Sequence, residues 1–253
     1  NTPASFEPTL DYVATKMPRF PFDKFADANN SLGTQMKATG EVMSIGRTIE
    51  ESLLKAIRSL EIGLYHLENK RFDGMSEDEL TEYIKVGTDD RIYAIAELLR
   101  IGCSEEKIAQ ASGIDVLFIN KLKNIIDKET EIKTNPLNTD VLRVAKKTGF
   151  SDREIAKLWN LSETEIFKIR KYAGIIPVYK MIDTCASEFE SYVPYFYSTY
   201  EEENESVVSD NKKVIVLGSG PIRIGQGVEF DYSTVHAVKT IKAAGYEAII
   251  INN

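Results

Sequence analysis

The chain has 253 residues, enough for one large domain or two ordinary domains that each bury a core. Its formal net charge of -8 disfavours a general nucleic-acid binder and a protein that binds anionic membranes. No apolar run approaches the roughly 18 residues that span a bilayer, and the N-terminus, NTPASFEPTL, lacks the form of a signal peptide. The two cysteines, Cys103 and Cys185, indicate no disulfide framework. These features predict a cytoplasmic protein.

Residues 1–61 are predicted to be the tail of an α/β domain. Tyr12–Thr15 and Met36–Thr39 are strand candidates. Gly40 separates the second of these from a third candidate, Val42–Ile45, which suggests a hairpin or a bent ribbon around the glycine.

A helix is predicted directly after these strands. Thr48 is followed three residues later by Glu51, which is the spacing of a capping box. The apolar residues that follow recur at helical spacing and give the helix one apolar face: Leu53, Leu54, Ile57 and Leu60.

The middle of the chain, residues 62–205, shows helical periodicity and few strand signals. One helix is expected from Asp89 to Ile101, because its apolar residues lie on one face and Gly102 follows as a stop signal. We therefore predict a compact all-α domain in this region.

Two segments within this region repeat each other at an offset of 47 residues. SEEKIAQASGIDVLFINKLK begins at Ser104, and SDREIAKLWNLSETEIFKIR begins at Ser151. Each copy has the pattern of a capped short helix, a turn and a second helix, which is an αα-hairpin of the helix-turn-helix type. Trp159 lies on the apolar face of the second copy and is predicted to be part of the core.

An aromatic run and a polar stretch follow the helical pattern. Tyr192–Tyr200 is too rich in aromatic residues for an ordinary loop, and we expect it to pack the helical domain against a neighbouring unit. Glu201–Asn211 is acidic and polar, which is typical of a linker. Residues 206–253 then form the third segment of the chain.

This third segment has the pattern of a βαβ unit. Val214–Leu217 is rich in β-branched residues and is bounded by Gly218, as expected of a strand buried on both faces. An amphipathic helix follows, Gly245 supplies its C-terminal stop, and Glu247–Ile251 has the composition of the next parallel strand. The fold class is therefore mixed, with a central all-α domain of two αα-hairpins between partial α/β segments.

The loop between this strand and helix is rich in glycine: Gly218, Gly220, Gly225 and Gly227. A dinucleotide-binding G-x-G-x-x-G pattern would need glycine where Arg223 stands. The acidic residue that would hold a ribose hydroxyl is also missing, because Asn252 and Asn253 end the second strand. The pattern thus disfavours NAD or FAD binding. A tight strand-to-helix turn is the simplest alternative.

The segment GSGPIRIGQGVEFDYS, together with the strand that ends in Asn-Asn, resembles the opening of the second synthetase half of the carbamoyl-phosphate synthase large chain. Three earlier stretches resemble the same family in the same order: TPASFEPTLDYVATKMPRF, GEVMSIGRTIEESLLKAIRSLE and PVYKMIDTCASEFESYVPYFYSTYEEE. The resemblance implies that residues 1–61 end the first ATP-grasp unit, that 62–205 form an α-helical oligomerisation domain, and that 206–253 begin the Rossmann-like pre-ATP-grasp domain of the second unit. We expect the chain to be a piece of that larger ligase.

The resemblance also implies a function for the parent enzyme. That enzyme joins bicarbonate, ammonia released from glutamine by a glutaminase small subunit, and two ATP into carbamoyl phosphate, for arginine and pyrimidine biosynthesis. It uses ATP with Mg or Mn, and its large chains associate through the helical domain. No catalytic residue, metal ligand or bound cofactor is expected within this piece, so we predict that it is inactive alone.

Three residues are placed along an intermediate tunnel by the resemblance: Glu41 in GEVMSIG, and Gly227 with Glu229 in IGQGVEF. Glycine lets the backbone approach such a passage closely, and paired carboxylates can bind water and keep a lumen polar. The alternative is that Glu41 faces solvent at a turn and that Glu229 caps the nearby helix. The role of Arg223 is left open.

The two αα-hairpins favour a different function, because helix-turn-helix units often place their second helix in the major groove of DNA. Lys121 and Lys123 in the first copy, and Lys168, Arg170 and Lys171 in the second, could contact phosphates. Residues 76–175 contain 18 acidic and 16 basic side chains, without the basic excess that phosphate contacts need. A DNA-binding regulator with a nucleotide-sensing βαβ unit is therefore the second hypothesis. His66 and His236 have no neighbouring ligands at zinc-site spacing.

Overall fold

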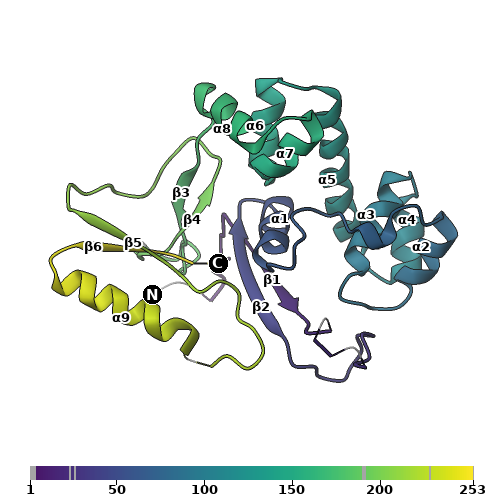
Figure 1. Cartoon of the computed structure of the whole chain (residues 1–253), viewed down its shortest axis with the longest axis horizontal. Helices are drawn as coiled ribbons and strands as arrows, with labels where there is room; N and C mark the ends of the chain where they lie inside the picture. The colour runs from purple at the N-terminus through teal and green to yellow at the C-terminus, as the bar shows by residue number, and fades with distance from the viewer. Residues whose placement is uncertain (1–3, 23, 26, 190–191, 228, 253) are drawn as a thin grey trace.

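The computed structural model describes residues 4–22, 24–25, 27–189, 192–227 and 229–252. A group of helices forms one side of the molecule, and two small sheets with helix α9 (Glu229–Ala243) form the other side (Figure 1). Between them lie strands β1 (Val13–Arg19) and β2 (Gly40–Gly46) and helix α1 (Ile49–Ser59). The fold class is mixed, as predicted.

Strands β1 and β2 pair antiparallel, with Val13 opposite Gly46 and Arg19 opposite Gly40. The predicted strand at 12–15 is thus correct in place but continues to Arg19. The predicted strand Met36–Thr39 is wrong, because this segment has no regular structure and the side chain of Met36 is 95% exposed. Strand β2 pairs instead with β1, and residues 20–39 lie between the two strands in the sequence.

Gly40 does not form the predicted turn between two strands. It is the first residue of β2, and a Cβ built on it would lie 2.1 Å from the carbonyl oxygen of Ile222. The glycine is needed for close approach of two backbone segments, which produces the same sequence signal as a turn.

Helix α1 begins where the sequence predicts, but its cap differs in one bond. Thr48 accepts a hydrogen bond from the backbone N–H of Glu51, as in a capping box. The Glu51 carboxylate accepts from the backbone N–H of Arg47 at 2.7 Å, one residue before the position that a capping box uses. The cap therefore also fixes the chain direction between β2 and α1.

The helical group contains a short 3-10 helix and seven α-helices in the part of the chain that the structure describes. They are η1 (Lys70–Phe72), α2 (Glu77–Ile84), α3 (Arg91–Arg100), α4 (Glu105–Ser112), α5 (Val116–Thr134), α6 (Thr139–Thr148), α7 (Asp152–Trp159) and α8 (Glu163–Tyr172). The helix expected at 89–101 is α3, and Gly102 follows it with φ of 90°.

The two repeated segments hold the helix pairs α4–α5 and α7–α8. Ser104 and Ser151 accept hydrogen bonds from the third residue of α4 and α7, which satisfies one free N–H at each helix start. Both short helices end in a left-handed residue, Gly113 or Asn160. Trp159 is 7% exposed and donates its indole N–H to the carbonyl of Ile132 at 2.7 Å, so the prediction that it is a core residue is confirmed.

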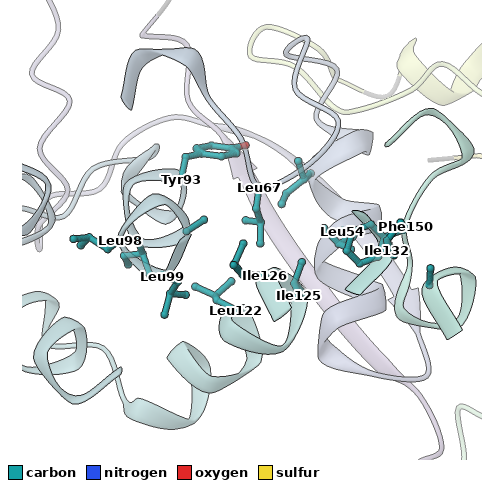
Figure 2. Close-up of a cluster of buried hydrophobic side chains, with 14 of the residues drawn as sticks. Leu54, Leu67, Tyr93, Leu98, Leu99, Leu122, Ile125, Ile126, Ile132 and Phe150 are labelled. Carbon is teal, nitrogen blue, oxygen red and sulfur yellow. The ribbon is translucent and has the colours of Figure 1, made fainter. Parts of the chain in front are cut away.

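The main hydrophobic core joins α1 to the helical group. Leu54 of α1, Ile132 of α5 and Phe150 after α6 are buried in one cluster that continues through α3 and α5 (Figure 2). On its other side, Ala56 of α1 and Leu60 directly after it form a smaller cluster with Val42 of β2. Helix α1 therefore packs against the strand pair on one side and against the helical group on the other.

Gly149 should be sensitive to substitution because it combines two constraints. Its φ is 102°, and a Cβ there would lie 2.8 Å from Cα of Glu51 in α1. Gly113 has φ of 70° but nothing within 4 Å of its Cβ position. We expect Gly113→Ala to cost about 1–2 kcal/mol of unfolding free energy, and Gly149→Ala to cost roughly 1–3 kcal/mol more through the clash. Urea unfolding of both variants measures this difference, and equal losses would show that α1 and α6 are not in contact there.

Strands β3 (Val178–Met181) and β4 (Phe196–Thr199) were not predicted, because the sequence shows few strand signals between 62 and 205. They pair antiparallel, with Val178 opposite Thr199. Each has only four residues, too few for an alternating pattern to stand out.

The aromatic run before the polar stretch contacts two parts of the molecule. Tyr197 is 6% exposed, and its ring lies 6.3 Å from that of Tyr12 in the N-terminal segment. The ring of Tyr200 lies 4.9 Å from Nζ of Lys146 in α6. Residues 201–208 have no helix or strand, but Glu205 donates its backbone N–H to the carbonyl of Tyr179 and so lies along β3.

The C-terminal βαβ unit is present as predicted. Strands β5 (Lys213–Leu217) and β6 (Glu247–Ile251) are parallel, with α9 between them in sequence, and Gly245 follows the helix with φ of 83°. The expectation that β5 is buried on both faces is wrong in this structure, since Ile215 is 58% and Leu217 75% exposed. Both residues lie on the same face of the sheet that β5 forms with β6, and this face is open to solvent.

None of the helices in the described residues has the length and the apolar character required to cross a lipid bilayer.

Candidate functional site at the junction of strand β2 and the glycine-rich loop

The start of β2 meets the glycine-rich loop that follows β5. The backbone N–H of Glu41 donates to the carbonyl oxygen of Ile222 at 3.1 Å, and the two residues form an isolated antiparallel bridge. The bare Cα of Gly40 makes room for this contact. Segments from opposite ends of the sequence therefore lie side by side at this junction.

Two ion pairs flank the bridge. Lys16 Nζ on β1 lies 2.8 Å from the carboxylate of Glu41, and Arg223 Nη2 in the loop lies 2.9 Å from the carboxylate of Glu61, just after α1. All four side chains are between 41% and 65% exposed, so each pair contributes little to stability. The pairs instead help to set the orientation of the loop relative to β1 and α1. Arg223, whose role the sequence left open, connects the glycine-rich loop to the end of α1.

The loop itself is shaped by glycines at close contacts. Gly220 has φ of 81°, and a Cβ there would lie 3.1 Å from the Glu61 carboxylate. A Cβ on Gly218 would lie 2.1 Å from the side-chain oxygen of Asn252. Gly225 also has positive φ, at 87°, with nothing within 4 Å of its Cβ position. Three of the four glycines that the sequence singled out thus answer a steric or conformational requirement.

The remaining tunnel candidates lie further along the same loop. Gly227 is exposed and stands two residues before Glu229, the first residue of α9. The side chain of Glu229 lies outside what the structure describes. The structure therefore brings Glu41 to the loop that carries Gly227, while the tunnel assignment of the three residues stays a prediction.

Helix α1 connects this junction to the helical group through its other end. The Glu50 carboxylate accepts a hydrogen bond from the Asn124 amide at 2.9 Å and lies 3.4 Å from Lys121 Nζ, both on α5. Burial alone would raise the pKa of Glu50, but the bond from Asn124 and the charge of Lys121 lower that pKa overall. Arg58 further along α1 donates to the carbonyl of Gly149 at 2.8 Å.

The chemistry available at the junction is that of a polar wall. Its groups are two carboxylates, two cations and backbone amides, which can bind water and small polar species. Within the described residues, no group of three or more His, Cys, Asp or Glu side chains could hold a metal ion.

His66 is buried and contacts the Glu129 carboxylate at 3.2 Å, and Arg100 contacts the same carboxylate at 2.8 Å.

Two family models match the chain. Residues 41–174, more than half of the sequence, match the model of the carbamoyl-phosphate synthetase large chain, oligomerisation domain. The chain therefore belongs to the carbamoyl-phosphate synthetase large-chain family. Residues 210–253 match the model of the carbamoyl phosphate synthase preATP-grasp domain. The two matches lie in the order that the sequence resemblance implies, and they support the ligase family and its oligomerisation domain.

The two matched ranges show that the junction joins segments from two different domains of the family. The first match begins at Glu41, at the start of β2, and includes α1 and the helical group. The second match includes Ile222 and Arg223. The bridge and the Arg223 ion pair therefore connect the segment of one match with the segment of the other. The division of the chain at residues 61 and 205 remains a prediction.

Sequence reasoning missed several residues of this junction. Lys16, Glu61 and Ile222 lie within the stretches that carry the family resemblance, but the sequence does not single them out, because their contacts are with partners far away in sequence. The one available signal was Gly40, a glycine at the start of a strand. Glycine there marks either a turn or a close backbone approach.

The basic residues proposed for DNA contacts are mostly engaged within the chain. Lys121 pairs with Glu50, Lys123 with Asp127, and Arg170 with Asp152. In each pair the cation binds a carboxylate of the same chain, whereas a DNA-binding surface uses such cations to contact phosphates.

Proposed function

We propose that this chain is the connector of a carbamoyl-phosphate synthase large chain. In this role it joins the end of the first synthetase unit to the start of the second and carries the surface through which large chains associate. The proposal assigns no catalytic residue to the chain itself. The reaction belongs to the parent enzyme, which makes carbamoyl phosphate from bicarbonate, glutamine-derived ammonia and two ATP with Mg or Mn.

The observation that carries the connector role is the pair of contacts made by the glycine-rich loop. Ile222 accepts a backbone hydrogen bond from Glu41 at the start of β2, and Arg223 reaches Glu61 at the end of α1. Helix α1 in turn packs into the core of the helical group. A displacement of the helical group would therefore be transmitted to the loop through one rigid helix.

A passage for the intermediate is the second part of the proposal. Glu41, Gly227 and Glu229 would line it, and Lys16 would hold the Glu41 carboxylate in place. The support is that Glu41 touches the loop that leads to Gly227. A polar wall suits carbamate, because its carboxylates can bind ordered water along the passage while the paired cations keep the net charge of the wall small.

The partners and the setting follow from the family. A glutaminase small subunit would supply ammonia, and other large chains would bind through the helical domain. The product would serve arginine and pyrimidine biosynthesis in the cytoplasm.

Self-association of the chain tests the connector role. We expect sedimentation equilibrium to show a mass that rises with protein concentration, because the helical region matches an oligomerisation domain. The open sheet face of the βαβ unit could also aggregate, since Leu217 and Ile251, which are paired across the two strands, are 75% and 52% exposed. The control is therefore the double variant Leu217→Lys with Ile251→Lys. Association that persists in this variant supports the proposal, and a monomer at all concentrations would count against it.

A further inference from the structure

A second feature of the molecule is a cavity on the side of α1 that faces α3 and α5. Its volume is about 710 Å³, within the range of small-molecule sites. Met17 of β1, Leu53 of α1, and Ile92 and Leu122 of α3 and α5 are among its largely apolar walls. Neither Glu41 nor any residue of the glycine-rich loop lines it, so it is separate from the junction described above.

One end of the β1 wall carries an arginine that has one buried nitrogen atom. Arg19 lines the cavity, and its Nη1 atom is buried with no hydrogen-bond partner among the residues that the structure describes. A guanidinium N–H in this position has lost water without gaining an acceptor, which costs free energy. Because guanidinium groups bind carboxylates and phosphates with strong directed bonds, an anionic group is the partner that this atom lacks.

The wall formed by the start of α3 carries both charges, because Arg91 lines the cavity beside two aspartates and Asp90 is paired with Arg71. Asp89 and Asp90 line the cavity there, together with the buried phenol of Tyr93. Burial, and the charge of Asp90 beside it, raise the pKa of the Asp89 carboxyl. A raised pKa favours the neutral form of the Asp89 carboxyl, so this wall repels an anion bound at Arg19 only weakly.

We propose that this cavity binds a small amphipathic molecule with a single anionic head group, held by Arg19, and an apolar body that fills the space between α1, α3 and α5. The head group is a carboxylate or a phosphate ester, both of which offer oxygen acceptors to a guanidinium. This binding site goes beyond the connector role and does not depend on it.

Four matched eight-carbon probes test the site by isothermal titration calorimetry on the whole chain: octanoate, octyl phosphate, octanol and octylammonium. We expect one equivalent of octanoate or octyl phosphate to bind, and the preferred anion identifies the head group. Octanol should bind roughly tenfold more weakly, because it lacks the charge-assisted bond to Arg19. Octylammonium should bind no better than octanol.

Two kinds of variant show whether binding occurs in the cavity. Arg19→Gln should weaken the anion about tenfold and leave octanol unchanged, whereas Arg143→Gln, which removes an arginine outside the cavity, should change neither. Ile92→Trp should weaken binding of all probes, because the larger side chain takes up part of the apolar space, and Leu53→Phe serves the same purpose if the first variant does not fold. No binding by either anion, or binding that Arg19→Gln and the filling variants leave intact, would overturn the proposal.

Discussion

Replacing Asp152 by alanine is expected to lower the free energy of unfolding by about 3–5 kcal/mol, because it leaves two buried cations without their partner. Asp152 contacts Lys146 Nζ at 2.7 Å and Arg170 Nε at 2.7 Å, and all three side chains are at most 12% exposed. These residues hold α6, α7 and α8 together. Urea unfolding followed by circular dichroism measures the loss.

A surface pair of the same type supplies the control. Asp127 pairs with Lys123 within α5 and is 60% exposed. Asp127→Ala should cost no more than about 1 kcal/mol, since exposed pairs contribute little. Equal losses for the two variants would show that the Asp152 cluster is hydrated like an ordinary surface pair.

Removing a cation from the same cluster should have a much smaller effect. Burial lowers the pKa of Lys146 from 10.5 to about 8, although Asp152 opposes the shift. Lys146→Met takes away a costly buried charge while Arg170 still pairs with Asp152, so stability should change little or rise. Between pH 8 and 10.5 the unfolded chain binds more protons at this lysine than the folded chain does. Stability should therefore rise with pH across that window, and Lys146→Met should remove this rise.

Gly40→Val should separate the start of β2 from the glycine-rich loop and so disrupt the proposed passage. The new Cβ would lie 2.1 Å from the carbonyl oxygen of Ile222, and a backbone atom cannot swing aside as a side chain can. Within the proposed parent enzyme, we expect the yield of carbamoyl phosphate per ATP hydrolysed to fall by on the order of tenfold or more, because small displacements at such a site have large effects. Parallel assays of ADP and carbamoyl phosphate measure this ratio.

Gly33 offers a matched control for this experiment. It lies in the same N-terminal segment, and nothing lies within 4 Å of its Cβ position. Gly33→Val should leave the ratio unchanged. If Gly40→Val also leaves it unchanged, the loop contact does not take part in transfer of the intermediate.

Features set by a few neighbouring residues could be predicted from the sequence. The serine caps of α4 and α7, the glycine that ends α3 and the bounds of β6 all depend on residues within one or two turns, and each is where the pattern places it. Strands β3 and β4 could not be predicted, because four-residue strands carry too little periodicity and their pairing depends on distant residues.

The candidate site was predictable in part for the same reason. The family motifs named Glu41 and the glycine-rich loop, but the contact between them depends on a backbone carbonyl at Ile222 that has no sequence signature. Gly40 indicates a turn and a close backbone contact equally well, because glycine is suited to both. The pairing of Lys146 with Asp152 has no sequence signal either, since a lysine in the last turn of a helix ordinarily faces solvent.

The connector role depends on the contact between the glycine-rich loop and the start of β2. A cysteine pair tests this directly, because opposed residues of an antiparallel bridge lie about 4.5–5.5 Å apart between Cα atoms, within disulfide range. Glu41→Cys and Ile222→Cys would be combined in a background with Cys103→Ala and Cys185→Ala, and Glu41→Cys with Lys239→Cys on α9 would be the control pair. Under mild oxidation at low protein concentration, we expect rapid formation of an intramolecular disulfide in the first pair and not in the second. Failure of the first pair to cross-link within one chain, or equal rates for both pairs, would contradict the claim.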